Sequence, residues 1–354
     1  MCVSASRRLN LPRSLRLFPD LLPNFGYTKW KRTTALLTEW PGNSVLGKSG
    51  IVMSQKCRFD LGYARIAKKA RMAMIEQKTI RKEIRLDGVG VHSGKSVHLV
   101  LKPSDSGEIM FRRTDLGNLE SPIEPGRIES RNSTTLIGDK FRVQTVEHLM
   151  AALYAFGVNS LIIELDADEV PIMDGSALPF VRALEQAGRQ GLSRKIPALK
   201  ILRPFALEEK GASIVIEPAD KTEGLSLSYT IEYPHPSIGR QSLSLTFRQE
   251  TFALDIAPAR TFGFIRDVEM LHSQGLALGA SFENTVVLDD EKVMNPPLRF
   301  PDEFVRHKLL DIAGDLALLG RPLLGRVTAH KAGHRLHFQV VQFLAASPDF
   351  WTDS

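Results

Sequence analysis

The strongest constraint in this 354-residue chain is the stretch at residues 303–319, which is apolar in almost every helical direction and still carries charges. A helix that is apolar on nearly all sides is predicted to be buried. Within it His307, Asp311 and Asp315 follow one another at intervals of four residues, so the imidazole and the two carboxylates stack along one edge, with Lys308 beside them. Burying ionised carboxylates costs several kcal/mol each unless something compensates. The fold must therefore supply a compensating group along this edge.

Two kinds of compensation fit this helix. One is a metal ion, because His-x-x-x-Asp places two ligands on one helical face, and a third His from elsewhere would complete a three-ligand catalytic zinc site. His148 is the candidate third ligand. The other is a buried His–Asp ion-pair network without a metal. The helix alone leaves both interpretations open.

His148 lies in a second predicted helix, residues 145–157. Thr145 is its predicted N-cap, and the apolar residues at helical spacing form a core stripe: Val146, Leu149, Met150, Leu153 and Phe156. His148 lies away from the centre of that stripe, and Glu147 sits beside it in the first turn. On this pattern alone Glu147 is a helix-dipole carboxylate and His148 a solvated imidazole.

Two further residues are ambiguous by pattern. His334 occurs in a Gly-containing turn, where a surface position is the ordinary interpretation, but next to Asp315 it would be a proton donor. Thr261 supplies a hydroxyl beside the aromatic Phe262. Neither is diagnostic by itself.

The arrangement of predicted elements is α+β. Alternation of apolar and polar residues predicts strands at 79–86, 96–102, 161–165, 199–202, 212–217, 225–233, 325–329 and 336–340, and helical spacing predicts helices at 145–157, 178–186 and 303–319. Residues 188–197 are interpreted as a linker. The similar layout on either side predicts two α+β domains, residues 74–192 and 193–354.

Charge is distributed unevenly along the chain. The net charge is +6, but residues 1–73 hold 14 Lys and Arg against three acidic residues, so the remainder is mildly acidic. We therefore predict no nucleic-acid partner despite the basic total. No apolar run approaches the roughly 18 to 20 residues that cross a bilayer, so no transmembrane segment is predicted.

Residues 1–73 have no sustained periodicity and contain both cysteines, Cys2 and Cys57. We interpret this leader as a disordered arm or a start-site artefact. An acid-poor, Arg-rich N-terminus is also typical of a mitochondrial transit peptide, which makes a mitochondrial location the alternative to a cytoplasmic one.

Six motifs, in order, resemble the UDP-3-O-acyl-N-acetylglucosamine deacetylases, zinc-dependent enzymes at the committed step of lipid A biosynthesis. They are GVGVHSG (88–94), TVEHLMAAL (145–153), PIMDGSA (171–177), ARTFGF (259–264), DEFVRHKLLDIAGDLALLG (302–320) and KAGH (331–334). The resemblance runs from about Met74 to the C-terminus. It implies two α+β domains of similar topology, with their helices packed between two outer β-sheet layers and the active site at the domain junction.

The resemblance also implies roles for the site residues. His148, His307 and Asp311 would bind Zn²⁺, with Fe²⁺ possible. Glu147 would be the general base for the attacking water, and Thr261 would help stabilise the oxyanion. His334, oriented by Asp315, would protonate the leaving amine.

The implied substrate is UDP-3-O-(3-hydroxyacyl)-N-acetylglucosamine, whose N-acetyl group is hydrolysed to release acetate. Lys308 would contact it by charge and Phe262 by packing on the sugar. An insert near 275–304 would form a hydrophobic passage for the acyl chain, with four candidate lining residues that composition alone would assign to a core: Val268, Ala277, Ser281 and Phe282. A cytoplasmic monomer is expected.

The sequence departs from the family pattern at His337 and Phe338, where the family usually has an Asn pair, and at Ala212, where it usually has Lys. Two alternative functions are considered. One is another metal-dependent amidase on the same scaffold. The other is an RNA-binding α+β module with a basic tail and a merely structural His–Asp cluster.

Overall fold

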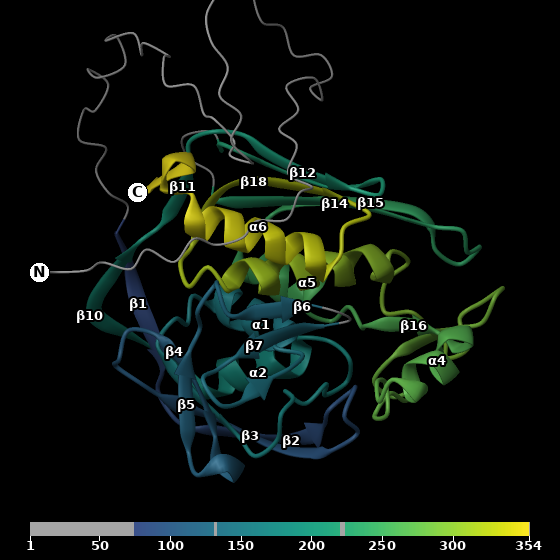
Figure 1. Ribbon diagram of the computed structural model, residues 1–354, viewed down its shortest axis with the longest axis horizontal. Helices are drawn as coiled ribbons and strands as arrows, with labels where there is room; N and C mark the ends of the chain where they lie inside the picture. The colour runs from purple at the N-terminus through teal and green to yellow at the C-terminus, as the bar shows by residue number, and fades with distance from the viewer. Residues whose placement is uncertain (1–73, 131–132, 220–223, 354) are drawn as a thin grey trace, which may run out of the picture. The chain divides into compact units, whose positions relative to one another are not determined.

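The computed structural model describes residues 74–353, apart from 131–132 and 220–223. Two sheets enclose a layer of helices in this part of the chain (Figure 1). The first sheet has the strand order β2-β3-β9-β4-β5. Its strands are β2 (Ile84–Val89), β3 (Ser96–Pro103), β4 (Ile109–Arg113), β5 (Leu119–Pro122) and β9 (Leu161–Leu165).

The second sheet has seven strands, and β18 joins its parts by pairing with β11, β13 and β14. Its strands are β11 (Leu199–Ile201), β12 (Phe205–Glu209), β13 (Ala212–Glu217), β14 (Leu225–Tyr233), β15 (Gly239–Thr246), β18 (Leu323–His330) and β19 (Trp351–Asp353). In β14 the side chains of Leu225, Leu227, Tyr229 and Ile231 are buried, whereas the residues between them are only partly covered. This alternation is typical of a sheet with one face on a core.

The helices lie between the two sheets. They are α1 (Glu147–Phe156), α2 (Leu178–Ala187), α5 (Glu303–Ala317) and α6 (His334–Ala346). The short helix α4 (Val268–Ser273) lies outside this layer, and α3 (Gln249–Thr251) is a further short helix. Helix α1 packs on both α2 and α5, and α5 packs on α6. The predicted α+β class, with helices between two outer sheet layers, is confirmed.

The described residues also form three smaller sheets. Strand β1 (Met74–Ile80) pairs with β10 (Arg189–Pro197), and β16 (Phe262–Phe264) pairs with β17 (Val286–Leu288). Strands β6 (Ile128–Ser130), β7 (Thr134–Ile137) and β8 (Arg142–Val143) form the third. The predicted domains, 74–192 and 193–354, remain a prediction, and the leader 1–73 with Cys2 and Cys57 lies outside the described residues.

Four local predictions are wrong. Residues 79–86 are not one strand, because they contain the end of β1, a bend at 81–82 and the start of β2. Residues 188–197 are not a linker, because they contain β10, a strand too polar to show an apolar face in the sequence. Residues 336–340 are not a strand but part of α6. Its buried side chains have helical spacing, and alternation in the sequence concealed it: Leu336, His337, Val340, Val341 and Leu344.

The fourth error concerns the start of α1. Thr145 is not its N-cap, because the helix begins at Glu147 and the Thr145 hydroxyl donates instead to the carboxylate of Glu169, at 2.9 Å. The predicted core stripe of α1 is buried, as expected, but Ala151 and Ala152 on other sides of the helix are also fully buried. Helix α1 is therefore enclosed on more faces than its sequence indicates.

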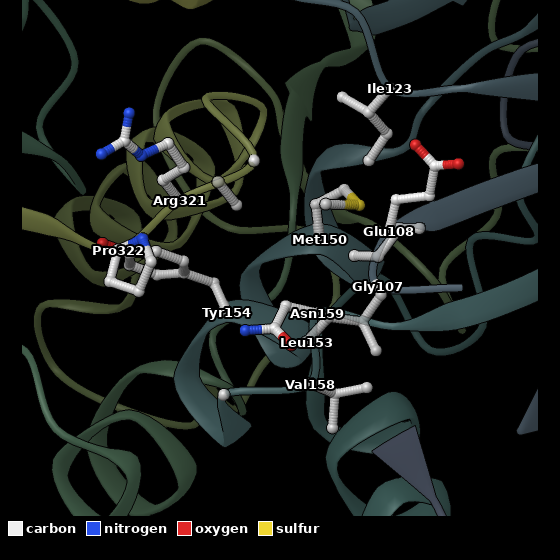
Figure 2. A pocket seen from close by; sticks show the side chains of 14 residues that line it. Gly107, Glu108, Ile123, Met150, Leu153, Tyr154, Val158, Asn159, Arg321 and Pro322 are labelled. Carbon is white, nitrogen blue, oxygen red and sulfur yellow. The ribbon is translucent and has the colours of Figure 1, made fainter. Parts of the chain in front are cut away.

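The C-terminal ends of α1 and α5 border a mostly apolar pocket of about 110 Å³ (Figure 2). Met150, Leu153 and Tyr154 line it from α1, and Arg321 and Pro322 line it from the chain after α5. None of the predicted site residues is among its lining residues. The site residues of α1, Glu147 and His148, lie at the opposite, N-terminal end of that helix.

Candidate active site

A close crossing of α1 and α5 creates the candidate site. At Gly314 of α5 an added Cβ atom would lie 2.0 Å from the backbone oxygen of Glu147. Only glycine allows this approach, which places the first turn of α1 directly beside the charged edge of α5. Glu147 and His148 are consequently buried, with 3% and 4% of their surface exposed, rather than solvated as the pattern of α1 suggested.

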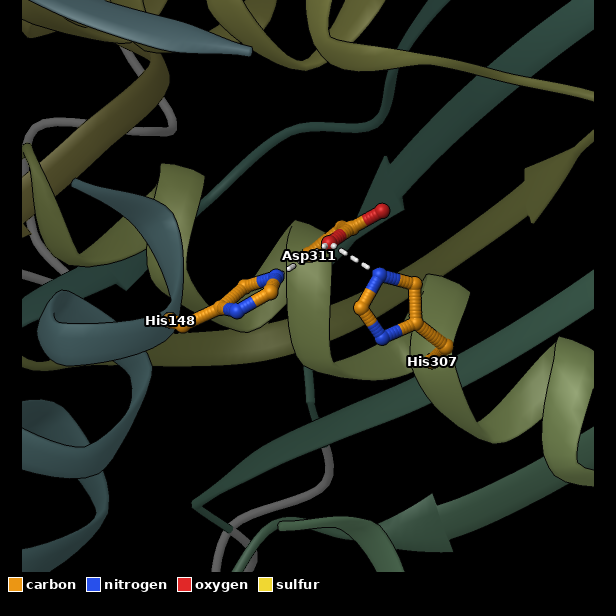
Figure 3. A group of neighbouring side chains, drawn as sticks. All are labelled: His148, His307 and Asp311. Atoms are coloured by element: carbon orange, nitrogen blue, oxygen red, sulfur yellow. Dashed lines mark ion pairs between the residues drawn. The ribbon is translucent and has the colours of Figure 1, made fainter. Parts of the chain in front are cut away.

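His148, His307 and Asp311 form the predicted metal-ligand cluster (Figure 3). The Nε2 atoms of His307 and His148 lie 3.3 and 3.7 Å from Oδ1 of Asp311. All three residues are buried, and one ligand atom from each lies within 4.8 Å of the others. Two helices that are far apart in the sequence thus bring these three side chains to one point.

This donor set fits a metal ion. Ligand atoms about 2.0–2.2 Å from a tetrahedral ion lie about 3.3–3.6 Å apart, close to the spacings observed here. The Nδ1 atom of His307 lies 3.1 Å from the carbonyl oxygen of Ala259, so an N–H there leaves Nε2 with its lone pair toward the cluster. Nδ1 of His148 is buried and has no hydrogen-bond partner among the described residues.

The charge states of the cluster also suit a cation. Burial lowers the pKa of His307 to about 3, which keeps its ring neutral, as a ligand must be. Burial would raise the pKa of Asp311, but the positive charges of Lys308 and His334 outweigh it and hold that pKa well below its usual range. Asp311 is therefore an anion in the absence of metal.

Glu147 and His334 face each other beside this cluster. Nε2 of His334 lies 3.7 Å from Oε1 of Glu147 and 3.7 Å from Oδ2 of Asp311. Burial raises the pKa of Glu147 to about 7, the range suited to a general base at neutral pH. Burial would lower the pKa of His334, but Asp315 and Asp311 outweigh it and raise that pKa to about 10.

Asp315 contacts His334 at Nδ1, the ring nitrogen that does not face Glu147. Its Oδ2 atom lies 2.7 Å from Nδ1 of His334. Burial would raise the pKa of Asp315, but the hydrogen bond and charge of His334 outweigh it and lower that pKa to about 2. The surface interpretation of His334 is wrong, because its side chain is only 10% exposed and it starts α6 against this carboxylate.

A cavity of about 410 Å³ opens on these groups. Ten of the residues predicted for the site line it: Glu147, His148, Thr261, Phe262, Val268, Ala277, His307, Lys308, Asp311 and His334. Asp315 lies behind His334, and Ser281 and Phe282 are not among the lining residues. The side chain of Phe282 is half exposed.

Lys308 connects the cluster to the aromatic wall of the cavity. Its Nζ atom donates to Oδ2 of Asp311 at 2.7 Å and lies 5.5 Å from the centre of the Phe262 ring. Burial would lower the pKa of Lys308, but the Asp311 carboxylate outweighs it and raises that pKa, so the side chain is a cation. A fixed positive charge therefore borders the cavity.

Three further residues support the site in ways that sequence patterns did not predict, although His337 already departs from the family pattern in the sequence. Thr134 donates its backbone N–H to Glu147 at 3.2 Å and its hydroxyl to Asp315 at 2.6 Å. His337 and Tyr229 extend the network behind Asp315. Thr134 and Asp315 are separated by 181 residues, so local patterns carry no sign of their contact.

Fold and site together define a class. An α+β protein with a buried two-histidine, one-carboxylate cluster, a neighbouring carboxylate base and a His–Asp pair has the groups of a metal-dependent amide hydrolase. The family profile described as "LpxC: UDP-3-O-acyl N-acetylglycosamine deacetylase" matches residues 77–346.

Curated relatives agree with this match. A protein of Nitratidesulfovibrio vulgaris is 44% identical over 79% of this chain and 91% of its own length, and one of Chromobacterium violaceum is 41% identical over 78% and 93%. A third, from Thermodesulfovibrio yellowstonii, is 41% identical over 76% and 91%. Each is named UDP-3-O-acyl-N-acetylglucosamine deacetylase. The chain belongs to the LpxC family of deacetylases. Within the described residues, each helix is too short or too polar to span a membrane.

Proposed function

We propose that this chain hydrolyses the N-acetyl group of UDP-3-O-(3-hydroxyacyl)-N-acetylglucosamine, the committed step of lipid A biosynthesis. The observation that carries this proposal is the buried His148–His307–Asp311 cluster beside Glu147 and His334, open to a cavity, in a chain that belongs to this deacetylase family. Water adds to the acetyl carbonyl carbon, the carbon–nitrogen bond breaks, and acetate and the free amine leave.

His148, His307 and Asp311 would hold a zinc ion, whose ligand preferences match two imidazoles and a carboxylate. Iron(II) accepts the same ligand types and is the alternative metal. When bound, the ion supplies a Lewis acid that polarises a carbonyl and lowers the pKa of water from 15.7 to about 7. The Lys308 hydrogen bond to Oδ2 of Asp311 keeps that carboxylate oriented with Oδ1 toward both imidazoles.

Glu147 is the proposed general base. Its carboxylate lies at the cavity wall beside the cluster, so it accepts the proton of the attacking water. The Thr134 backbone N–H fixes Oε2 of Glu147, which leaves Oε1 facing His334 across 3.7 Å. Thr261, at the same cavity, is the proposed hydroxyl donor to the oxyanion.

His334 is the proposed acid. With Nδ1–H bonded to Asp315, its Nε2–H faces the cavity and delivers a proton to the amine nitrogen as the carbon–nitrogen bond breaks. The raised pKa keeps this imidazole protonated at neutral pH. The pKa of the base, about 7, therefore lies below that of the acid, about 10, so at neutral pH Glu147 can accept a proton while His334 still carries one.

The cavity supports the proposed substrate. Lys308 offers a cation to the diphosphate side, and Phe262 an aromatic face to the sugar. Val268 and Ala277 line the cavity, and with Ser281, Phe282 and the insert near 275–304 they are the proposed passage for the acyl chain. The alternative of an RNA-binding module required a merely structural His–Asp cluster, and family membership speaks against it.

We further propose two domains, residues 74–192 and 193–354, and a monomer that works in the cytoplasm. The relatives named above are bacterial proteins, so they give no support to the mitochondrial alternative. Residues 1–73 would be a dispensable leader.

The acyl chain separates this proposal from another amidase on the same scaffold. We expect acetate release from UDP-3-O-(3-hydroxyacyl)-N-acetylglucosamine, and a loss of most of kcat/KM with UDP-N-acetylglucosamine, which lacks that chain. The measurement is acetate release for the two substrates under identical conditions. Equal kcat/KM for both would favour the other amidase.

A further inference from the structure

His337 is a fully buried histidine with a partner near each ring nitrogen. It lies three residues after His334 in the first turn of α6, so the two imidazoles project from the same side of the helix. Its Nδ1 atom lies 2.7 Å from Oδ2 of Asp315, and its Nε2 atom lies 3.2 Å from the hydroxyl oxygen of Tyr229. The function proposed above does not use it.

Asp315 is shared between the two histidines. Nδ1 of His334 lies 2.7 Å from the same Oδ2 atom, and the Thr134 hydroxyl donates to Oδ1 at 2.6 Å. Because an ionised carboxylate only accepts hydrogen bonds, each imidazole presents an N–H at its Nδ1. The carboxylate is thereby held at both oxygens, and Nε2 of His334 is the nitrogen left to face Glu147.

Tyr229 contacts both His337 and the backbone just before His334. Its hydroxyl donates to the carbonyl oxygen of Ala332 at 2.6 Å, and its buried ring meets the His337 ring edge-on, with 6.0 Å between centroids. His337 therefore touches β14 on one side and the α5 carboxylate on the other. It is not among the residues that line the cavity.

We propose that His337 is a positioning residue for the proton-donating side of the reaction. Its Nδ1–H holds Oδ2 of Asp315 where the His334 Nδ1–H meets it, and so aims Nε2 of His334 into the cavity. Without His337 the Asp315 carboxylate keeps only one donor on Oδ2 and gains freedom to rotate away from His334. This proposal rests on the proposed function, because it matters only if His334 acts on the substrate.

The kinetic test compares His337→Leu, which removes the donor, with His337→Asn, whose amide nitrogen stands at the same side-chain position as Nδ1. In the full-length, metal-containing protein we expect His337→Leu to lower kcat about ten- to a hundredfold, with KM and bound metal unchanged. His337→Asn should restore most of kcat. If His337→Leu does not fold, His337→Met, which adapts to irregular gaps, replaces it.

Val341→Ala is the matched control, because Val341 is equally buried on the same helix and has no polar side-chain atom. It should lower stability and leave kcat unchanged. A His337→Leu protein that folds and keeps the kcat of the parent, or a Val341→Ala protein that loses kcat as much, would overturn the proposal.

A spectroscopic test does not depend on turnover. Proton NMR of the ¹⁵N-histidine-labelled protein should include two downfield imidazole N–H resonances that come from the Nδ1–H groups of His334 and His337 on Asp315. His337→Leu should lose the His337 resonance and shift that of His334. His337→Asn should also lose the His337 resonance but leave that of His334 in place. An unmoved His334 resonance in His337→Leu overturns the positioning role, while a parent protein that shows both resonances and releases no acetate overturns the proposed function instead.

Discussion

At the scale of single residues, the site separates its charges by burial and pairing. Burial raises the pKa of Glu147 to about 7, because the nearby positive charges do not offset the loss of solvent. Asp315 is also buried, but the charge of His334 and the hydrogen bonds from His334 and His337 lower its pKa to about 2. The Thr134 hydroxyl donates a further hydrogen bond to Asp315. Two carboxylates of one site therefore differ in proton affinity because of what surrounds each. This difference suits one to move a proton and the other to hold a cation in place.

The proposed roles of ligand and base can be separated by substitution. His307→Ala and Asp311→Ala should each lower metal affinity at least tenfold, because each removes one of three ligands. Glu147→Ala should keep metal and lose nearly all turnover. Elemental analysis after dialysis, together with acetate release, measures both. A Glu147→Ala protein that is folded but metal-free would contradict the assignment of Glu147 as the base.

The raised pKa of His334 predicts how the metal-free protein responds to pH. Burial works against this shift, but Asp315 and Asp311 outweigh it and raise the pKa from 6.5 to about 10, so between these values the folded state keeps a proton that the unfolded state has lost. The stability is complete below pH 6.5 and is lost as the pH rises toward 10, by at most about 1.4 kcal/mol per pH unit for one proton. Urea unfolding of the chelated protein at pH 7.5 and 9.5 measures this loss. His334→Gln should flatten the difference, and an equally steep loss in that variant would refute the assignment.

At the scale of elements, the crossing of α1 and α5 determines the site. Both helices are buried on nearly all sides. The apolar composition of α5 predicts this burial, whereas the composition of α1 predicts it only in part. The stacking of His307, Asp311 and Asp315 could be predicted because it follows from helical periodicity alone. The contact that brings Glu147 and His148 to this edge depends on Gly314, whose role no local pattern reveals.

Gly314→Ala tests this crossing. Alanine in a helix is ordinarily about 1 kcal/mol better than glycine, but here its Cβ would meet the Glu147 backbone oxygen at 2.0 Å and force the helices apart. We expect a net destabilisation of about 1–3 kcal/mol and a loss of kcat of about 100-fold as Glu147 shifts. Denaturant unfolding and acetate release measure the two effects.

Gly126→Ala is the control for that substitution, since an added Cβ there meets nothing within 4 Å. It should change neither stability nor kcat appreciably. A Gly314→Ala protein that is more stable than the parent and fully active would mean that the helices do not need this close approach.

The elements that sequence patterns missed share a physical cause. Strand β10 is polar because it forms a two-stranded ribbon with β1, so it lacks the alternation of a strand on a core. In α6 the residues Leu336, Phe338 and Val340 alternate as in a strand, while the burial of His337 and Val341 that reveals a helix depends on tertiary packing. By contrast, β9, β13 and β14 have the residue ranges that alternation predicts.

At the scale of the whole molecule, the candidate site is built from segments far apart in the chain. The proposed ligands, Glu147 and the His–Asp pair are predicted from motifs that occur in the order typical of the family, and the structure brings these side chains together. The roles of Thr134, Tyr229 and His337, which contact these groups, could not be predicted from the sequence. They depend on contacts between elements that are distant in the chain. The residue types of the site can therefore be predicted from the sequence, whereas the orientation of their side chains depends on the fold.

The central claim is that the buried His–Asp cluster is a metal centre for deacetylation. The most direct measurement is the metal content of the purified full-length chain, combined with acetate release from UDP-3-O-(3-hydroxyacyl)-N-acetylglucosamine with and without a chelator. We predict about one zinc per chain and acetate release that the chelator abolishes and added zinc restores. A folded protein that binds no metal and releases no acetate, or one whose activity the chelator leaves unchanged, would contradict the claim.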